Sequence, residues 1–179
     1  MTIDRDMSTT GPDLKAWDQP TENGARDWFY NKMTRSQYEP WREAYAKKNA
    51  LYYEKEAELK GEDFVRWKYQ RFLQDYLACV ASVDDSIGQV LEFLDKSGLT
   101  ENTIVIYSSD QGFFLGEHGW FDKRFMYEPS LRTPLVVRWP RAIEPGRTES
   151  RIVSNVDFAQ TFLELAGAQK EVTMQGMSL

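Results

Sequence analysis

A helical repeat of apolar residues over positions 62–97 constrains the fold of this chain more than any other feature. The apolar positions recur every three or four residues: Val65, Tyr69, Phe72, Tyr76, Val80, Val83, Ile87, Val90 and Leu94. This spacing puts them in one stripe on an α-helix, and such a stripe is predicted to face a core. Gly98 suits the residue after the last turn, because glycine readily adopts the positive φ that often ends a helix. The chain is therefore predicted to be organised around one long helix.

Two short apolar runs after this helix predict strands. Residues 103–109 form the first, and its continuous apolar character is typical of a buried strand in a parallel sheet. Residues 135–139, ended by Pro140, form the second. A further helix is predicted to run to Leu165, with Asn155 or Asp157 as its cap. The order helix, strand, loop, strand, helix indicates the α/β fold class.

The residues before the long helix predict less regular structure. Residues 1–23 are polar and contain glycine and proline, which indicates a loop or an extended segment. Residues 24–59 are rich in aromatic and charged side chains and predict short helices. We interpret this aromatic series as a packing surface, because large aromatic residues are usually buried against other side chains.

The composition restricts the classes of partner. The formal net charge of −6 argues against a nucleic-acid partner. No run of residues is long and apolar enough to predict a membrane span, and residues 1–23 show no signal-peptide pattern. The single cysteine, Cys79, excludes a disulfide within the chain. None of these features indicates a cellular compartment.

The residues that follow the first predicted strand carry the chemistry. Asp110 and Gln111 come directly after it, at the edge where ligands bind in open α/β sheets. Their side-chain oxygens suit a hard divalent cation. His118, the only histidine, and Lys123 follow in the same segment, and an imidazole and an ammonium suit an anionic ester. Together these residues indicate metal-assisted chemistry on a sulfate or phosphate ester.

The same segment resembles the signature of the sulfatase family, within the alkaline phosphatase superfamily. The matching motifs are Asp110-Gln111-Gly112, Leu115-Gly116-Glu117-His118-Gly119, Lys123 and Tyr127-Glu128. The resemblance covers about residues 67–179 and is strongest to bacterial sulfatases related to the heparan and N-acetylglucosamine-6-sulfate enzymes. It implies an incomplete alkaline phosphatase-like sandwich, with a mixed, mostly parallel sheet flanked by helices. Residues 1–61 would be a variable region of that domain, and residues 62–179 its C-terminal part.

The resemblance also implies roles for individual residues. Asp110 and Gln111 would bind Ca²⁺, in preference to Mg²⁺. His118 and Lys123 would be both catalytic and substrate-binding, holding the sulfate and assisting departure of the alcohol. The substrate would be a sulfated carbohydrate or another sulfate ester. Glu117 and Asp122 are expected to be structural partners of the loop.

The nucleophile of the family is not found in this chain. Sulfatases convert the cysteine of Cys-x-Pro/Ala-Ser-Arg to formylglycine, whereas Cys79-Val80-Ala81-Ser82 is followed by Val83 instead of arginine. Because this stretch lies within the predicted long helix, we predict that Cys79 is a buried core thiol. The formylglycine is expected in a missing N-terminal part, so the chain alone is expected to be an inactive piece of a larger enzyme. Two alternatives are a phosphodiesterase or phosphonate monoester hydrolase of the same superfamily, and a non-catalytic remnant.

Overall fold

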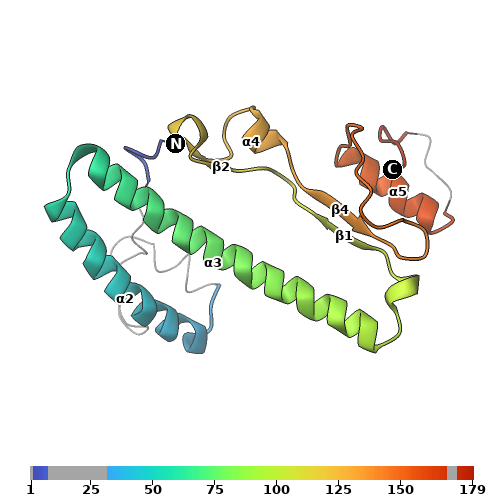
Figure 1. The fold of residues 1–179 in the computed structure, drawn as a ribbon, viewed down its shortest axis with the longest axis horizontal. Helices are drawn as coiled ribbons and strands as arrows, with labels where there is room; N and C mark the ends of the chain where they lie inside the picture. The colour runs from blue at the N-terminus through green and yellow to red at the C-terminus, as the bar shows by residue number, and fades with distance from the viewer. Residues whose placement is uncertain (1, 8–31, 169–172) are drawn as a thin grey trace. The chain divides into compact units, whose positions relative to one another are not determined.

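A computed structural model of the chain describes residues 2–7, 32–168 and 173–179 (Figure 1). Two long helices come first, followed by short strands and helices. The elements are α2 (Arg35–Glu58), α3 (Gly61–Lys96), η1 (Thr100–Asn102), β1 (Val105–Ser108), β2 (Phe114–Leu115), η2 (Glu117–Gly119), β3 (Phe121–Asp122), α4 (Glu128–Leu131), β4 (Leu135–Arg138) and α5 (Val156–Leu165). This mixture of helices and strands confirms the α/β class. None of the described helices combines the length and the apolar character that a membrane span requires.

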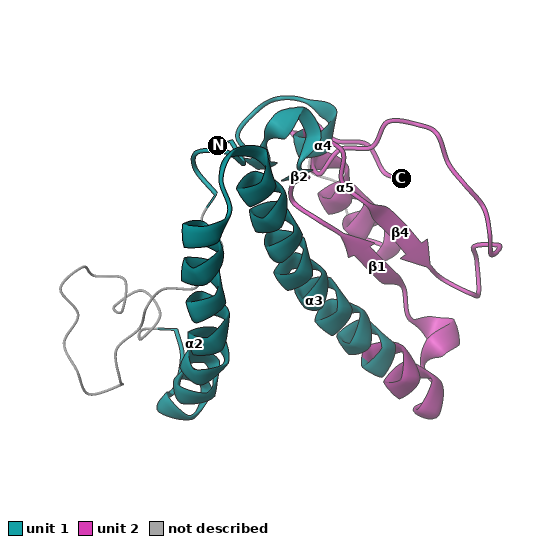
Figure 2. Cartoon of the chain, turned by 60° about the vertical axis from the view of Figure 1, so that its left-hand side comes forward, with its two compact units in different colours: residues 1–89, 113–130 teal, residues 90–112, 131–179 magenta. Residues whose placement is uncertain are grey.

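The chain forms two compact units (Figure 2). Unit 1 comprises residues 1–89 and 113–130, and unit 2 comprises residues 90–112 and 131–179. The predicted division into residues 1–61 and 62–179 concerns regions of one catalytic domain, and it stays a prediction.

Helix α3 confirms the long helix that the apolar repeat predicts. It spans 36 residues and begins with Glu62 and Asp63, whose negative charges favour the positive end of the helix dipole. Lys96 complements the opposite end. Gly98 has a φ of 68°, so the predicted glycine stop is also confirmed.

The prediction of short helices before α3 is wrong for the described residues, because positions 35–58 form the single helix α2. At its start, the backbone N–H of Thr34 donates to Gln37 Oε1 at 2.9 Å, which satisfies a donor that the helix itself cannot pair. The aromatic residues of α2 do serve packing, as predicted. Tyr38 is fully buried, and the ring of Tyr52 lies 5.9 Å from that of Trp67 on α3.

A second face of α3 supports a short hairpin in unit 1. Strands β2 and β3 pair antiparallel, and β2 contributes the fully buried Phe114. From α3, the ring of Phe72 lies 6.1 Å from Phe121 of β3, and Tyr76 lies 5.7 Å from Phe113 just before β2. This aromatic contact fixes the hairpin against the helix.

Strands β1 and β4 form the sheet of unit 2. They pair antiparallel, with Val105 opposite Arg138 and Ser108 opposite Leu135. The parallel pairing predicted for this strand is therefore not seen among the described residues. The strand is also only partly buried, with Tyr107 exposed. A continuously apolar strand sequence indicates that both faces of the strand can be buried. Whether the neighbouring strand runs parallel or antiparallel depends on chain connections outside the strand.

The prediction that Cys79 is a buried core thiol is wrong, because Cys79 is exposed in the structure. Its neighbours on the apolar repeat, Val80 and Val83, are both 47% exposed. The repeat correctly identifies a helix face. Which parts of that face are covered is decided by other segments, and the described residues cover its N-terminal part more fully.

Helix α5 ends at Leu165, as predicted, and the C-terminal residues dock on it. Asp157 accepts a hydrogen bond from Met177 N at 2.8 Å and another from Ser154 N at 2.8 Å. These donors, that of Met177 first, hold the pKa of Asp157 below its ordinary value. Leu179 N donates to Thr161 Oγ1 and Gln160 Nε2 donates to Met174 O, both at 3.0 Å, so the docked segment is held at several points.

Candidate functional site

The turn after β1 presents the two predicted metal ligands at the end of the strand. Ser109 Oγ donates to the backbone oxygen of Gln111 at 2.8 Å and closes a tight turn around Asp110. Asp110 is exposed, whereas Gln111 is half-buried. A carboxylate oxygen and an amide oxygen thus lie on consecutive residues, in a position accessible from solvent. Both are donor types that Ca²⁺ prefers.

His118 lies at the tip of the hairpin between β2 and β3, in a loop with unusual backbone angles. Gly116 has a φ of 123°, and His118 itself has a φ of 60°. Gly116 N donates to Trp120 O, and Gly119 N donates to Gly116 O, both at 2.9 Å. A residue other than glycine rarely adopts a positive φ unless its surroundings impose it. The loop is therefore held in one conformation that carries His118 outward.

Helix α3 anchors this loop through Tyr69. The Tyr69 hydroxyl donates to the backbone oxygen of Leu115 at 2.6 Å. The Tyr69 ring also fills the space in which a Cβ on Gly116 would lie, only 3.0 Å from the Tyr69 Cε2 atom. On the other side of the loop, Leu115 N donates to Glu117 Oε2 at 2.7 Å. Glu117 is thereby confirmed as a structural partner of the loop.

Aromatic rings surround the imidazole of His118. The His118 ring centroid lies 5.5 Å from that of Trp120, 5.7 Å from Tyr127 and 6.4 Å from Phe114. Phe114 is fully buried, whereas His118 and Tyr127 are exposed. The imidazole therefore packs against aromatic rings, and the exposed ring of Tyr127 provides apolar surface beside it.

Lys123 follows the hairpin, and Asp122 fixes the backbone that carries it. Asp122 is buried, has a φ of 76°, and accepts the backbone N–H of Lys123 through Oδ1 at 2.8 Å. Its other oxygen accepts Arg124 Nε at 2.9 Å. Asp122 is thereby confirmed as a structural partner. Among the described residues no carboxylate forms an ion pair with Lys123, so its exposed ammonium is available to an anion.

The structure places the four predicted site residues in two pairs. Asp110 and Gln111 lie on one turn of unit 2, while in unit 1 His118 lies on the hairpin and Lys123 directly follows it. Convergence of the two pairs stays a prediction. In the described part of the chain, no group of three or more histidine, cysteine, aspartate or glutamate side chains is arranged to hold a metal. Asp110 and Gln111 can thus provide only part of the six to eight oxygens typical for Ca²⁺.

Three supporting residues were missed by sequence reasoning. Tyr69 was assigned only to the apolar stripe, Ser109 only to the end of a strand, and Trp120 had no assigned role. Serine directly after a strand often bonds the backbone two residues on, which is the signal that Ser109 offered. Nothing local in the sequence indicates that Tyr69 reaches a loop 46 positions away.

Comparison with known proteins gives a consistent set of similarities. Residues 116–179 match the family described as N-sulphoglucosamine sulphohydrolase, C-terminal. The chain is 51% identical to an N-acetylglucosamine-6-O-sulfatase of Bacteroides thetaiotaomicron over 150 residues, which is 84% of this chain and 26% of that protein. It is 39% identical to the human N-acetylglucosamine-6-sulfatase over 100 residues, which is 55% of this chain and 18% of that protein.

A solved structure extends this similarity to the fold. It is described as a complex with the substrate D-glucosamine-2-N,6-O-disulfate. It superposes with a TM-score of 0.77 at 45% identity, covering all of this chain and 36% of that one. The chain spans about a quarter of the length of the bacterial relative.

Proposed function

Because the chain belongs to the sulfatase family, we propose that it forms part of an enzyme that hydrolyses sulfate esters on glucosamine-containing carbohydrates. The observation that carries this proposal is the hairpin of unit 1, which presents His118 and Lys123 on a rigid support. Similarity to relatives named for sulfated glucosamine supports the substrate class. It also disfavours the phosphodiesterase alternative.

In this proposal, Lys123 binds the non-bridging oxygens of the sulfate. The Lys123 ammonium, which pairs with no carboxylate of the described residues, would offset negative charge on the ester and stabilise the charge that develops during reaction. His118 donates a proton to the alcohol oxygen as the bond between sulfur and that oxygen breaks. Trp120 and Tyr127 provide an apolar surface beside the imidazole, against which a sugar ring can stack.

Asp110 and Gln111 would hold Ca²⁺, which suits their oxygen donors and would polarise the sulfate when bound. The attacking group would be a formylglycine that lies outside these 179 residues, since Cys79 lacks the arginine of the motif and lies within α3. We therefore expect the 179-residue chain to show no turnover of an aryl sulfate, with or without Ca²⁺.

Binding of glucosamine-6-sulfate to the chain, measured by titration calorimetry, tests the proposal. Lys123→Ala should weaken this binding about tenfold, the low end of the effect of a hydrogen bond to a charged group. Arg124→Ala is the matched control, because Arg124 is adjacent but already paired with Asp122. Equal affinities for the two variants would refute the role of Lys123. Turnover of an aryl sulfate that Lys123→Ala abolishes would refute the proposed location of the nucleophile.

A further inference from the structure

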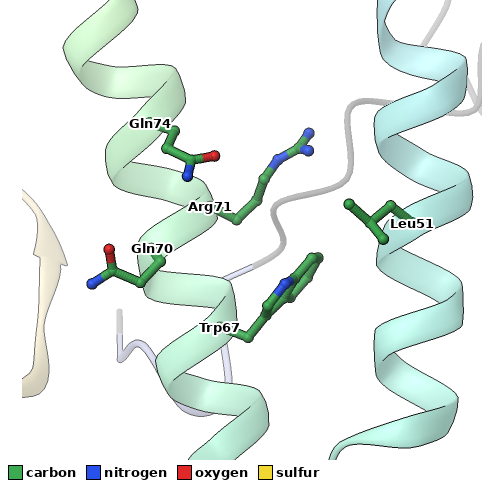
Figure 3. A pocket seen from close by; sticks show the side chains of 5 residues that line it. All are labelled: Leu51, Trp67, Gln70, Arg71 and Gln74. Carbon is green, nitrogen blue, oxygen red and sulfur yellow. The ribbon is translucent and has the colours of Figure 1, made fainter.

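A hollow of about 240 Å³ lies between α2 and α3 in unit 1. Its lining residues are Leu51, Trp67, Gln70, Arg71 and Gln74. Figure 3 shows Trp67 and Arg71 reaching from α3 toward α2, where Leu51 faces them, while Gln70 extends to the other side of α3. We call this space the interhelix pocket.

Arg71 is the unusual member of the pocket. Its side chain is only 7% exposed, yet Nε and Nη2 have no hydrogen-bond partner among the residues that the structure describes. Asp75 lies near it, with Arg71 Nη2 and Asp75 Oδ2 3.6 Å apart, which is too long for a hydrogen bond. Leaving the donors of a buried charged group unsatisfied is costly. Such a group is therefore suited to bind an acceptor that enters from outside.

In the described part of the chain, Arg71 belongs to a linked set of three charged side chains. The other oxygen of Asp75 accepts Lys48 Nζ at 2.6 Å, so one carboxylate is shared between two cations. Counting Arg71, Lys48 and Asp75, the local charge is two positive minus one negative, or +1. A ligand that carries a single negative charge would balance it.

The walls of the pocket specify the rest of the ligand. Trp67 is half-buried and Leu51 is partly exposed, so an apolar surface lies next to the guanidinium. An aromatic face of this kind packs against the C–H face of a ring. Gln74 adds an amide that can pair with hydroxyl groups. Guanidinium groups bind carboxylate and sulfate oxygens in a bidentate manner.

The pocket is separate from the hairpin that carries His118. Tyr69 and Arg71 are two residues apart on α3, so they point about 200° apart around the helix axis. Tyr69 contacts the hairpin, whereas Arg71 points toward α2. A ligand in the interhelix pocket would therefore contact a different face of α3.

We propose that the interhelix pocket binds a monoanionic sugar, with its carboxylate or sulfate on Arg71 and its ring against Trp67. This second site needs neither the catalytic hairpin nor a metal, so it goes beyond the proposed hydrolysis. It would hold an acidic unit of a glycan independently of any ester being cleaved.

Titration calorimetry of the 179-residue chain with glucuronate, N-acetylglucosamine-6-sulfate and neutral N-acetylglucosamine tests this proposal. Both anionic sugars should bind, and N-acetylglucosamine should bind at least about tenfold more weakly, because it offers Arg71 no charged acceptor. Arg71→Gln should weaken glucuronate binding by about tenfold or more. Arg66→Gln is the matched control, since Arg66 lies on the same helix but is 76% exposed. It should leave the affinity unchanged.

Two further measurements keep the proposal falsifiable. If Arg71→Gln fails to fold, the NMR signal of the Trp67 indole N–H in the unaltered chain can be followed instead. This signal, assigned with Trp67→Phe, should shift on addition of glucuronate and not of N-acetylglucosamine. Lys123→Ala should leave glucuronate binding intact, which separates this site from the proposed sulfate-ester site. Absence of glucuronate binding, an unshifted Trp67 signal, or equal loss in Arg71→Gln and Arg66→Gln would show that Arg71 is merely hydrated.

Discussion

Substitution of Gly116 by alanine should disrupt the loop that carries His118. The φ of 123° at Gly116 belongs to a region that residues with a Cβ rarely adopt. An added Cβ would also lie 3.0 Å from both Cε2 and the hydroxyl oxygen of Tyr69. That hydroxyl donates the 2.6 Å hydrogen bond to Leu115 O. A single added methyl group should therefore disfavour the backbone conformation of Gly116 and also displace the Tyr69 hydroxyl that bonds the loop to α3.

The two costs can be estimated separately. Holding a non-glycine residue in a sparsely populated backbone region costs about 1–3 kcal/mol. Displacing the Tyr69 hydroxyl from Leu115 O costs about 0.5–1.5 kcal/mol more. We expect Gly116→Ala to destabilise the closed loop by about 2–4 kcal/mol, a large part of the roughly 5–15 kcal/mol that stabilises a typical domain.

Amide hydrogen exchange measures this effect locally. The backbone N–H at position 116 donates to Trp120 O, so its exchange reports opening of the loop. A loss of about 2–4 kcal/mol corresponds to exchange roughly 30-fold to several hundredfold faster.

Two variants separate the causes. Gly119 also has a positive φ, of 72°, but a Cβ added there would contact no other atom of the described residues. Gly119→Ala should therefore carry only the backbone cost of about 1–2 kcal/mol. Tyr69→Phe removes only the hydrogen bond. If Gly116→Ala accelerates exchange no more than Gly119→Ala does, the contact with Tyr69 is not what fixes the loop.

Other predictions concern unit 2 and α3. The folded pKa of Asp157 is lowered, so its contribution to docking of the C-terminal segment is full above the ordinary pKa and is lost as pH falls through the folded pKa. The protection factor of the Met177 N–H, which is corrected for the intrinsic pH dependence of exchange, should therefore fall in acid, and Asp157→Asn should lower it at neutral pH. A protection factor independent of pH would contradict this. Gly176→Ala should release the same segment to proteolysis, because its Cβ would lie 2.0 Å from Val156 O, and unchanged protection would contradict that contact. The exposed Cys79 thiol should react with a disulfide reagent at a similar rate in native buffer and in urea, whereas strong native protection would argue for burial.

The local pattern of the sequence was sufficient for several features. The apolar repeat predicted α3 to within a residue at each end, and Gly98 marked its stop. The apolar runs located β1 and β4, and the short motifs located the segment that carries the candidate site. Residues within one helix or one tight turn interact with neighbours a few positions away, so their order in the chain fixes their geometry. The resemblance to the sulfatase family could likewise be found from short motifs of consecutive residues.

Only the tertiary structure decided which surfaces are covered and which residues support the site. Helix α2 lacks a simple apolar stripe, yet it forms because Tyr38 and Tyr52 are buried in unit 1. Cys79 lies on an apolar face that the described residues leave exposed, and the partner of β1 runs antiparallel. Tyr69 gains its role only when α3 meets a loop far along the chain. Burial, strand partners and long-range hydrogen bonds depend on segments distant in sequence, so a periodic pattern shows that a face can be buried but not what covers it.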